Sequence, residues 1–320
     1  MKLGILVPCY NEEGNVEKFF EVVTEKIREC DWIRQYTILF INDGSSDNTL
    51  KKIKNMAEER EGVSYLSFAR NFGKEAAMLA GFSKLVELEF DYIGIMDADL
   101  QDPPDLLPAM IEKLENNKEL DCVVARRVNR AGEGRIRSFF SNLFYSVFNL
   151  FSDINIKPGT RDFRVMKLDV AKALVEMGER NRFSKGLFAW VGYNTEWVEY
   201  ENIIREQGSS KWSFLKLCSY AIDGIISFST IPLTVVSALG GFICLASFVG
   251  FLVIFIQKLV GGLDIEGYAL LTCSVFLLSG VQLLSLGIIG RYISKIYTET
   301  KGRPVYFIRE QYNSIQTQDE

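Results

Sequence analysis

Two carboxylates, Asp97 and Asp99, follow the apolar run 92–96 and precede Gln101 and a Pro-Pro pair. In an extended segment, side chains at i and i+2 point to the same side. Two like charges there repel each other unless a cation lies between them. A hard divalent cation, Mg²⁺ or Mn²⁺, meets this need, because a carboxylate or two and substrate phosphates can hold it. The motif therefore predicts a metal–diphosphate site at the end of a buried strand.

Alternating strands and helices are predicted around this motif. The strand-like runs are 3–7, 36–41, 63–68, 92–96 and 122–125, and the helical patterns are 13–30, 50–60, 74–87 and 105–116. Strands that are apolar throughout favour a mostly parallel sheet with helices on both faces. In such sheets ligands bind beyond the carboxyl ends of the strands. Polar clusters follow Val7, Ile41 and Met96, so we expect the site at that edge.

The composition excludes some chemistry. The 320 residues contain no histidine, so a base or a metal ligand must come from other residue types. The six cysteines form no Cys-x-x-Cys pair and are interpreted as reduced thiols. The net charge of −5 indicates little, because the basic residues are clustered.

Two long stretches without charge, 230–256 and 267–290, are predicted to cross a membrane. Each exceeds the roughly 20 residues that span a bilayer core of about 30 Å. Both lie far from the N-terminus, so neither is a signal peptide. Their flanks are basic, whereas the connection between them holds Lys258 beside Asp264 and Glu266. The positive-inside rule therefore places both termini in the cytosol of a multi-pass protein of the plasma (inner) membrane.

Two amphipathic segments have two interpretations. Residues 136–151 carry six aromatic side chains, and residues 213–228 carry an apolar stripe opposite polar residues. Each fits a helix that lies in the membrane interface, or an ordinary helix that faces the protein core. The adjoining membrane span favours the interfacial interpretation for residues 213–228.

Four motifs occur in order: Pro8-Cys-Tyr-Asn-Glu-Glu13, Asn42-Asp-Gly-Ser-Ser-Asp47, Ala69-Arg-Asn-Phe-Gly-Lys74 and Met96-Asp-Ala-Asp-Leu-Gln-Asp-Pro-Pro104. Together they resemble the family-2 glycosyltransferases of GT-A fold. More narrowly, the chain is similar to the polyprenyl-phosphate glycosyltransferases, such as dolichyl-phosphate mannose synthases and bacterial undecaprenyl-phosphate glucosyl- or N-acetylglucosaminyltransferases. The resemblance covers about the first 215 residues by motif and the two-span tail by architecture.

The resemblance implies a Rossmann-like GT-A catalytic domain, an α/β structure with a mostly parallel sheet, plus interfacial helices and a transmembrane hairpin. The cytosolic catalytic domain would cover 1–212 and the interfacial helix 213–228. Two transmembrane helices would lie within 229–291, at about 230–256 and 267–290. A cytosolic tail would cover 292–320.

The resemblance also assigns roles to single residues. Nucleotide-sugar binding is implied for Pro8, Tyr10, Glu12, Asp43, Asp97 and Gln101, and metal binding for Asp97, Asp99 and Gln101. Lipid-phosphate binding is implied for Arg126 or Arg127, with Arg137 and Ser141. The catalytic residues would be Asp162, Asp99, Arg205 and Lys211, the last two on a loop that closes over the pyrophosphate. Asp102 stands where relatives often carry His, a departure that we expect to leave metal binding unchanged.

Two roles are possible for Asp162. It could orient or deprotonate the acceptor, or it could form an ion pair with its neighbour Arg161 or with Arg164. A phosphate acceptor needs no strong base, because it already carries about −1.5 to −2 charges at pH 7.

The expected activity is metal-dependent, inverting transfer of a hexose from a nucleoside diphosphate sugar, UDP-glucose or UDP-N-acetylglucosamine, to undecaprenyl or another polyprenyl phosphate. The product would serve cell-envelope glycosylation, and nucleic acid is not expected as a partner. The alternatives are a processive polysaccharide synthase and a catalytically inactive, membrane-anchored nucleotide-sugar-binding module. Two spans and Gln207-Gly-Ser-Ser-Lys-Trp212 count against the synthase. The sugar, the nucleobase, the choice of metal, the downstream acceptor and self-association through membrane glycines stay open.

Overall fold

The computed structural model describes residues 1–128, 146, 148–152, 154–201, 222, 224–261 and 268–314. Its first half alternates strands and helices: β1 (Lys2–Cys9), α1 (Val16–Arg28), β2 (Gln35–Asn42), α2 (Thr49–Glu59), β3 (Val63–Phe68), α3 (Lys74–Glu87), β4 (Tyr92–Ile95), α4 (Leu106–Asn116) and β5 (Cys122–Arg127). The second half adds β6 (Thr160–Lys167), α6 (Leu168–Glu176), α7 (Ser184–Trp190), β7 (Thr195–Tyr200), α9 (Ile231–Gly261), α10 (Tyr268–Thr300) and β8 (Ile308–Tyr312). The five strands and four helices expected before residue 128 are all present, with ends shifted by a few residues.

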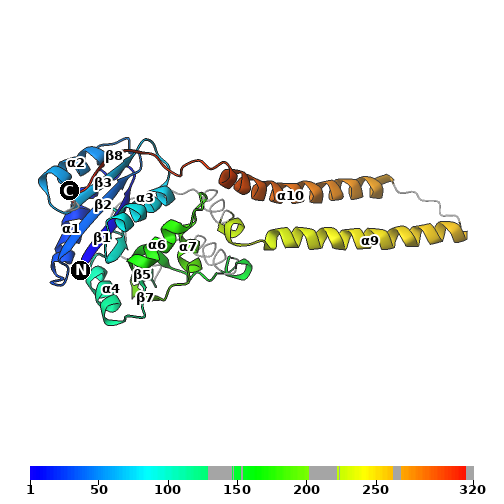
Figure 1. Cartoon of the computed structure of the whole chain (residues 1–320). Helices are drawn as coiled ribbons and strands as arrows, with labels where there is room; N and C mark the ends of the chain where they lie inside the picture. Colours follow the sequence, from blue (N-terminus) through cyan, green and yellow to red (C-terminus); the bar gives the residue numbers. More distant parts are fainter. Residues whose placement is uncertain are drawn as a thin grey trace.

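One sheet contains all the strands, in the order β7-β5-β6-β4-β1-β2-β3-β8. Strands β1 to β4 pair in parallel, as do β5 and β7. Strand β6 runs antiparallel to both its neighbours, and β8 runs antiparallel to β3. The expected Rossmann-like GT-A architecture, with a mostly parallel mixed sheet between helices, is confirmed (Figure 1).

Both faces of the sheet are buried, which explains the apolar strands. One core contains the inward side of α1, where Val16, Phe19, Val23 and Ile27 recur at helical spacing and are at most 2% exposed. Burying each such large side chain contributes about 1.5–3 kcal/mol. The other core packs α3 closely on β1, and a Cβ on Gly81 would lie only 1.9 Å from Leu6 Cδ1.

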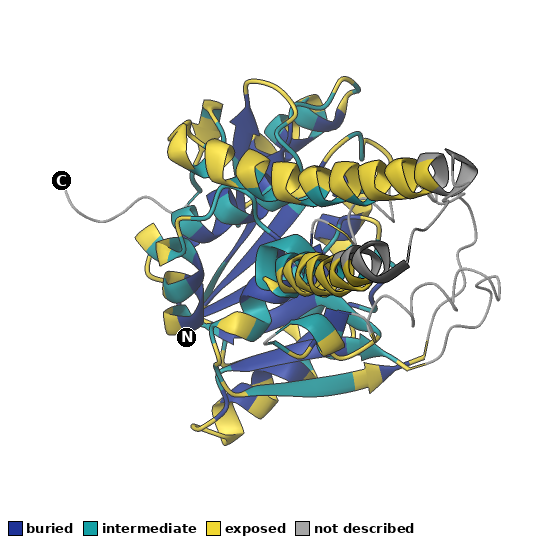
Figure 2. Ribbon diagram, turned by 90° about the vertical axis from the view of Figure 1, so that its right-hand side faces the viewer, coloured by how far each residue is buried: buried dark blue, intermediate teal, exposed yellow. Residues whose placement is uncertain are grey.

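Helices α9 and α10 extend away from this domain, as Figures 1 and 2 show. Within them, Ile231–Gly250 and Ser274–Thr300 are long and apolar enough to cross a membrane, judged by length and composition. Their large apolar side chains are exposed, for example Phe242 and Phe276 at 70% and 72%. Most of the aromatic segment 136–151 and of segment 213–228 lies outside the described residues.

The C-terminal segment is part of the domain, which the sequence analysis did not anticipate. Helix α10 continues ten residues beyond the span expected to end at 290, and β8 then pairs with the edge strand β3. The ring of Tyr306 stacks on Phe68 at 5.1 Å, and the N–H of Ala69 donates to the Phe307 carbonyl at 3.0 Å. A five-residue strand with exposed ends has little local signal, and its pairing depends on the β3 edge.

The end of α10 is also tied to the domain. The backbone N–H groups of Arg180 and Asn181 donate to the Glu299 carboxylate at 2.9 and 3.0 Å. The apolar helix pair is therefore connected to the sheet both through this contact and through β8.

Deleting residues 305–320 should lower the thermal midpoint Tm of the detergent-solubilised protein by roughly 4–8 °C. The deletion removes β8 and Tyr306, whose packing we value at about 2 kcal/mol, and leaves the β3 edge open. Differential scanning fluorimetry measures the change. The control deletes only 315–320 and should keep the original Tm, so equal Tm values for the two deletions would contradict the role of β8.

Candidate functional site

The carboxyl ends of β1, β2 and β4 meet at one edge of the sheet. Cys9 lies opposite Asn42 in the β1–β2 pair, and Leu6 lies opposite Ile95 in the β1–β4 pair. The N–H of Asp43 continues the pairing by donating to the Cys9 carbonyl at 2.9 Å. Three of the four motifs follow these strands directly, so the fold places them together as expected.

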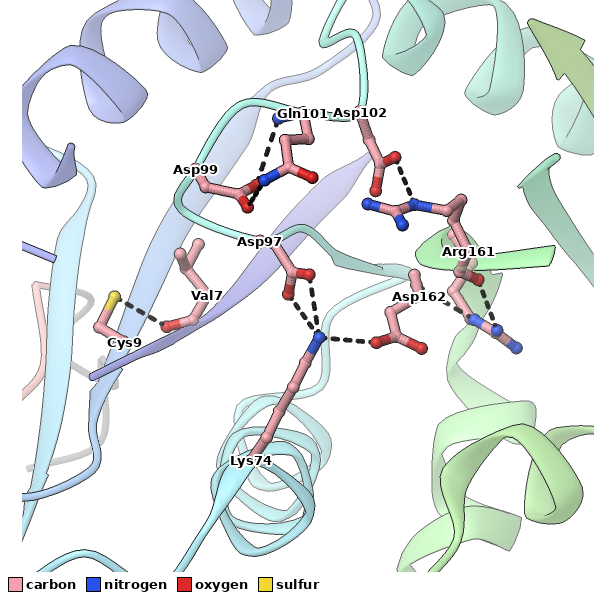
Figure 3. A network of polar contacts seen from close by, with 10 residues as sticks. Val7, Cys9, Lys74, Asp97, Asp99, Gln101, Asp102, Arg161 and Asp162 are labelled. Atoms are coloured by element: carbon pink, nitrogen blue, oxygen red, sulfur yellow. Dashed lines mark hydrogen bonds and ion pairs between the residues drawn. The ribbon is translucent and has the colours of Figure 1, made fainter. Parts of the chain in front are cut away.

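The Asp97 and Asp99 carboxylates are not held side by side on an extended segment, and that geometric expectation is wrong. Strand β4 ends at Ile95, residues 98–99 form a turn, and Leu100 has a φ of 53°. Asp97 therefore faces the N-terminus of α3, whereas Asp99 accepts hydrogen bonds from the backbone and side-chain amides of Gln101 (Figure 3). Their charges still interact. Burial is the main reason why the pKa of Asp97 is raised above its usual value. The negative charges of Asp162 and Asp99 raise this pKa further, and the positive charge of Lys74 opposes the rise.

Lys74 joins two carboxylates that are far apart in the sequence. Its Nζ lies 2.7 Å from Asp97 Oδ1 and 2.6 Å from Asp162 Oδ2 (Figure 3). From the sequence, Lys74 was noted only as the last residue of the motif that begins at Ala69. A signal was present, because a cation in the first turn of a helix opposes the helix dipole and needs another reason to be there.

Asp162 is ionised at neutral pH in this arrangement. Burial alone would raise its pKa, but the nearby charges of Lys74, Lys185 and Arg164 hold the pKa well below its usual range. The expected alternative, an ion pair with Arg161 or Arg164, is wrong. Arg164 donates to the backbone carbonyls of Asp162 and Arg161 at 3.2 and 3.0 Å, and the Asp162 carboxylate pairs with Lys74. A carboxylate of such low basicity is a poor general base.

The Asp43 carboxylate is bound to backbone amides and does not point into an open site. Its two oxygens accept the N–H groups of Phe72 and Gly73 at 2.6 and 2.9 Å, and the residue is 3% exposed. The adjoining Gly44 has a φ of 63°, and a Cβ there would lie 2.4 Å from the Arg70 carbonyl carbon. Asp43 thus fixes the loop before α3, the loop that positions Lys74.

The loops after β1 and β2 hold each other. Pro8 and Cys9 are the last residues of β1, and burial raises the pKa of the Cys9 thiol. The N–H of Glu12 donates to Thr49 Oγ1 at 2.8 Å, and Glu12 Oε2 accepts from the Asn15 amide at 2.6 Å. Tyr10 is 46% exposed on the rim. These contacts give the residues expected to bind the nucleotide a defined frame.

Asp102 has two side-chain partners that its sequence position did not indicate. It is buried, accepts from Arg161 Nε at 2.8 Å and also accepts from the Tyr200 hydroxyl. These contacts join the loop after β4 to β6 and β7. The departure at this position is therefore explained by packing, and its carboxylate is directed away from Lys74 (Figure 3).

The residues expected to bind a lipid phosphate are only partly described. Arg126 Nη1 pairs with Glu199 Oε1 at 2.9 Å, and its Nε donates to the Pro158 carbonyl at 3.1 Å. Both Arg126 and Arg127 lie at the end of β5, where Arg127 N–H donates to the Gly159 carbonyl. Four expected site residues lie outside the described residues: Arg137, Ser141, Arg205 and Lys211.

The donor set fits a divalent cation held jointly with a ligand. Lys74 contacts the carboxylates of Asp97 and Asp162, Asp162 has further cations beside it, and the charge of Asp99 acts on Asp97. Asp97 therefore shares the Lys74 ammonium with Asp162, whereas Asp99 accepts only from the neutral amides of Gln101 among the described residues. In the part of the chain that the structure describes, no three acidic or thiol side chains converge to form a complete cation cage. Mg²⁺ commonly binds through one or two carboxylates plus phosphate oxygens, so this arrangement matches it.

Replacing Asp102 with Asn should destabilise the protein by about 3–5 kcal/mol, because the partly buried Arg161 would lose its carboxylate. Chemical denaturation followed by tryptophan fluorescence measures the loss. Asp105→Asn is the matched control, since the Asp105 side chain is 72% exposed and its pair with Lys26 contributes at most about 1 kcal/mol. Equal denaturation midpoints for the two variants would contradict a structural role for Asp102.

Comparisons with known proteins identify the family of the chain. Residues 4–175 match the profile described as "Glycosyl transferase family 2". A solved structure, "Mannosyltransferase PcManGT from Pyrobaculum calidifontis in complex with GDP-Man and Mn2+", is 15% identical with a TM-score of 0.46, and covers 93% of this chain and 86% of its own. The "Putative glycosyltransferase CsbB" of Bacillus subtilis (strain 168) is 43% identical over 308 residues, 96% of this chain and 91% of that one. The "Bactoprenol glucosyl transferase" of Shigella phage SfX is 39% identical over 311 residues, 97% of this chain and 99% of that one. The chain therefore belongs to glycosyl transferase family 2.

Proposed function

We propose that this glycosyltransferase transfers glucose from UDP-glucose to a polyprenyl phosphate at the cytosolic face of a membrane, with inversion at the sugar. The observation that carries the proposal is the cluster of Asp97, Lys74 and Asp162 at the carboxyl ends of the strands, in a chain with two long exposed apolar helices. Relatives named bactoprenol glucosyl transferases, which match 97% of the chain, support the lipid acceptor and glucose.

Breaking the bond between sugar and diphosphate leaves negative charge on the leaving oxygens. Asp97 and Asp99, with Gln101 beside them, are the residues that would hold Mg²⁺ or Mn²⁺ there. Such a cation supplies Lewis-acid stabilisation of the leaving diphosphate. Lys74 holds Asp97 in place from the α3 side, and Arg205 and Lys211 would add positive charge over the pyrophosphate.

The acceptor needs docking rather than deprotonation. A phosphate monoester is ionised at neutral pH, and arginine offers it bidentate contacts. Arg126 and Arg127 at the end of β5 are proposed to supply these contacts together with Arg137 and Ser141, with Glu199 released from Arg126 when the lipid binds. Direct attack of the phosphate oxygen on the sugar accounts for the proposed inversion.

The apolar helices would keep the site at the bilayer surface. A polyprenyl chain stays in the membrane, because each buried CH₂ contributes about 0.8 kcal/mol. We therefore propose that α9 and α10 cross the plasma (inner) membrane as a hairpin, with the catalytic domain and both termini in the cytosol.

The first test incubates the purified full chain with Mg²⁺ or Mn²⁺, undecaprenyl phosphate and a panel of nucleotide sugars, and analyses the lipid fraction by mass spectrometry. We expect one hexose per lipid with UDP-glucose, loss of product with EDTA, and recovery on adding the metal. Asp97→Asn should reduce the rate at least about 100-fold, because charge on the leaving group is no longer stabilised. Asp105→Asn is the control. A glycolipid formed equally by Asp97→Asn would contradict the metal site, and no glycolipid with any donor would contradict the function.

A second test separates a positioning role of Asp162 from general-base catalysis. Asp162→Asn should lower kcat by roughly 10–100-fold through loss of the Lys74 contact, while the dependence of kcat on pH stays the same. The reason is that the low pKa of Asp162 keeps the carboxylate ionised over the whole assay range, so it contributes no pH step above pH 5. A step that is present in the original protein and absent from Asp162→Asn would identify Asp162 as the base. Asp169→Asn, a change at a side chain 78% exposed, is the control.

A further inference from the structure

A cavity of about 500 Å³ lies where the end of α10 meets the catalytic domain. Its apolar wall includes Phe72 from the loop before α3, Ala76 from the first turn of α3 and Val305 from the C-terminal segment. Its charged lining comprises Arg180, Arg182, Lys301 and Arg303, with Glu75 on the α3 side. Glu75 immediately follows Lys74, so the cavity adjoins the candidate active site, but its lining includes neither Lys74 nor the carboxylates Asp97, Asp99 and Asp162.

The cavity lies at the end of the candidate membrane span of α10. The candidate span of α10 ends at Thr300, and the cavity is lined by Tyr297, Thr298 and the residues that follow. In the proposed hairpin, this is the boundary between the hydrocarbon and the cytosolic face. Basic pockets at this depth bind anionic lipid headgroups.

The charges of the lining are unevenly compensated. Arg180 pairs with Glu299 at 3.6 Å and donates to the Arg303 carbonyl, so it is occupied. Arg182 donates to the carbonyls of Met177 and Leu174. Its charge also faces Glu75, whose carboxylate accepts from Ser184.

Lys301 and Arg303 are the two cations of the lining that have no carboxylate partner among the described residues. Among the described residues, the ammonium of Lys301 contacts only the hydroxyl and the ring of Tyr297, and the Arg303 guanidinium has no ion pair. The α10 terminus attracts cations through its dipole, but this end is already closed by backbone bonds, from Lys301 N–H to Tyr297 and from Gly302 N–H to Glu299. Helix capping therefore explains neither the cavity nor its apolar wall.

We propose that this cavity binds the phosphate of an anionic membrane phospholipid. Lys301 and Arg303 contact the phosphate diester, and the wall formed by Phe72 and Val305 faces the glycerol and the first methylenes. The proposal rests on the membrane hairpin of the proposed function. A lipid bound here connects α10 to the start of α3, and so sets the height of Lys74 above the membrane surface.

The test uses the purified full chain in detergent and native mass spectrometry, with titration of dioleoyl phosphatidylglycerol or dioleoyl phosphatidylcholine. We expect one phosphatidylglycerol to bind roughly 10–30-fold more tightly than phosphatidylcholine, which is the effect of two cations near an anionic headgroup. The double variant Lys301→Gln, Arg303→Gln should lose this preference. The control Lys18→Gln, Lys51→Gln removes the same charge from exposed positions on α1 and α2, and should keep it.

Equal affinity for the two lipids, or an unchanged preference in the Lys301→Gln, Arg303→Gln variant, would overturn the proposal. Binding of inorganic phosphate at concentrations where phosphatidylglycerol does not bind would also overturn it, because the cavity would then be a site for free phosphate. Glycosyl transfer is measured on the same samples. Lipid preference without any transfer contradicts only the proposed reaction, and transfer without lipid preference contradicts only this site.

Discussion

The crowding of negative charge at the carboxyl end of β4 is the constraint on which the site depends. Asp97 and Asp162 approach the same point from two strands, and they can do so because the ammonium of Lys74 lies between them. That ammonium is placed by the first turn of α3, whose preceding loop is held by Asp43 through two backbone amides. The position of the charge therefore depends on backbone contacts made at the end of a different strand, β2.

The low basicity of Asp162 and the chemistry of a phosphate acceptor fit together. An acceptor hydroxyl would require a base of raised pKa, whereas here the surrounding cations lower the pKa of the carboxylate nearest the cluster. An anionic acceptor requires instead that the site tolerate one further phosphate beside the diphosphate of the donor. In the proposed reaction the carboxylate cluster would act on the leaving diphosphate, and the arginines at the end of β5 would bind the acceptor.

The C-terminal segment gives the apolar helices a defined relation to the catalytic domain. Strand β8 covers the β3 edge, and Glu299 accepts from two backbone amides of the domain. The same segment packs against the aromatic residues that precede α3, including Phe72. The C-terminal end of α10 and the start of α3 are thus close neighbours, although more than 220 residues of the chain lie between Lys74 and Thr300.

Local patterns by themselves determined the first nine elements, the glycosyltransferase motifs and the two apolar helices, because burial on both faces and helical spacing leave a direct trace in residue order. Tertiary structure decided which charges meet. Lys74 and Asp162 are 88 residues apart, and Asp102 and Tyr200 are 98 apart, so no local period encodes these pairs. It also decided that Asp97 and Asp99 diverge, because a turn at Leu100 replaces the extended segment. Strand β8 was equally invisible, since a short exposed strand is stabilised by the edge that receives it.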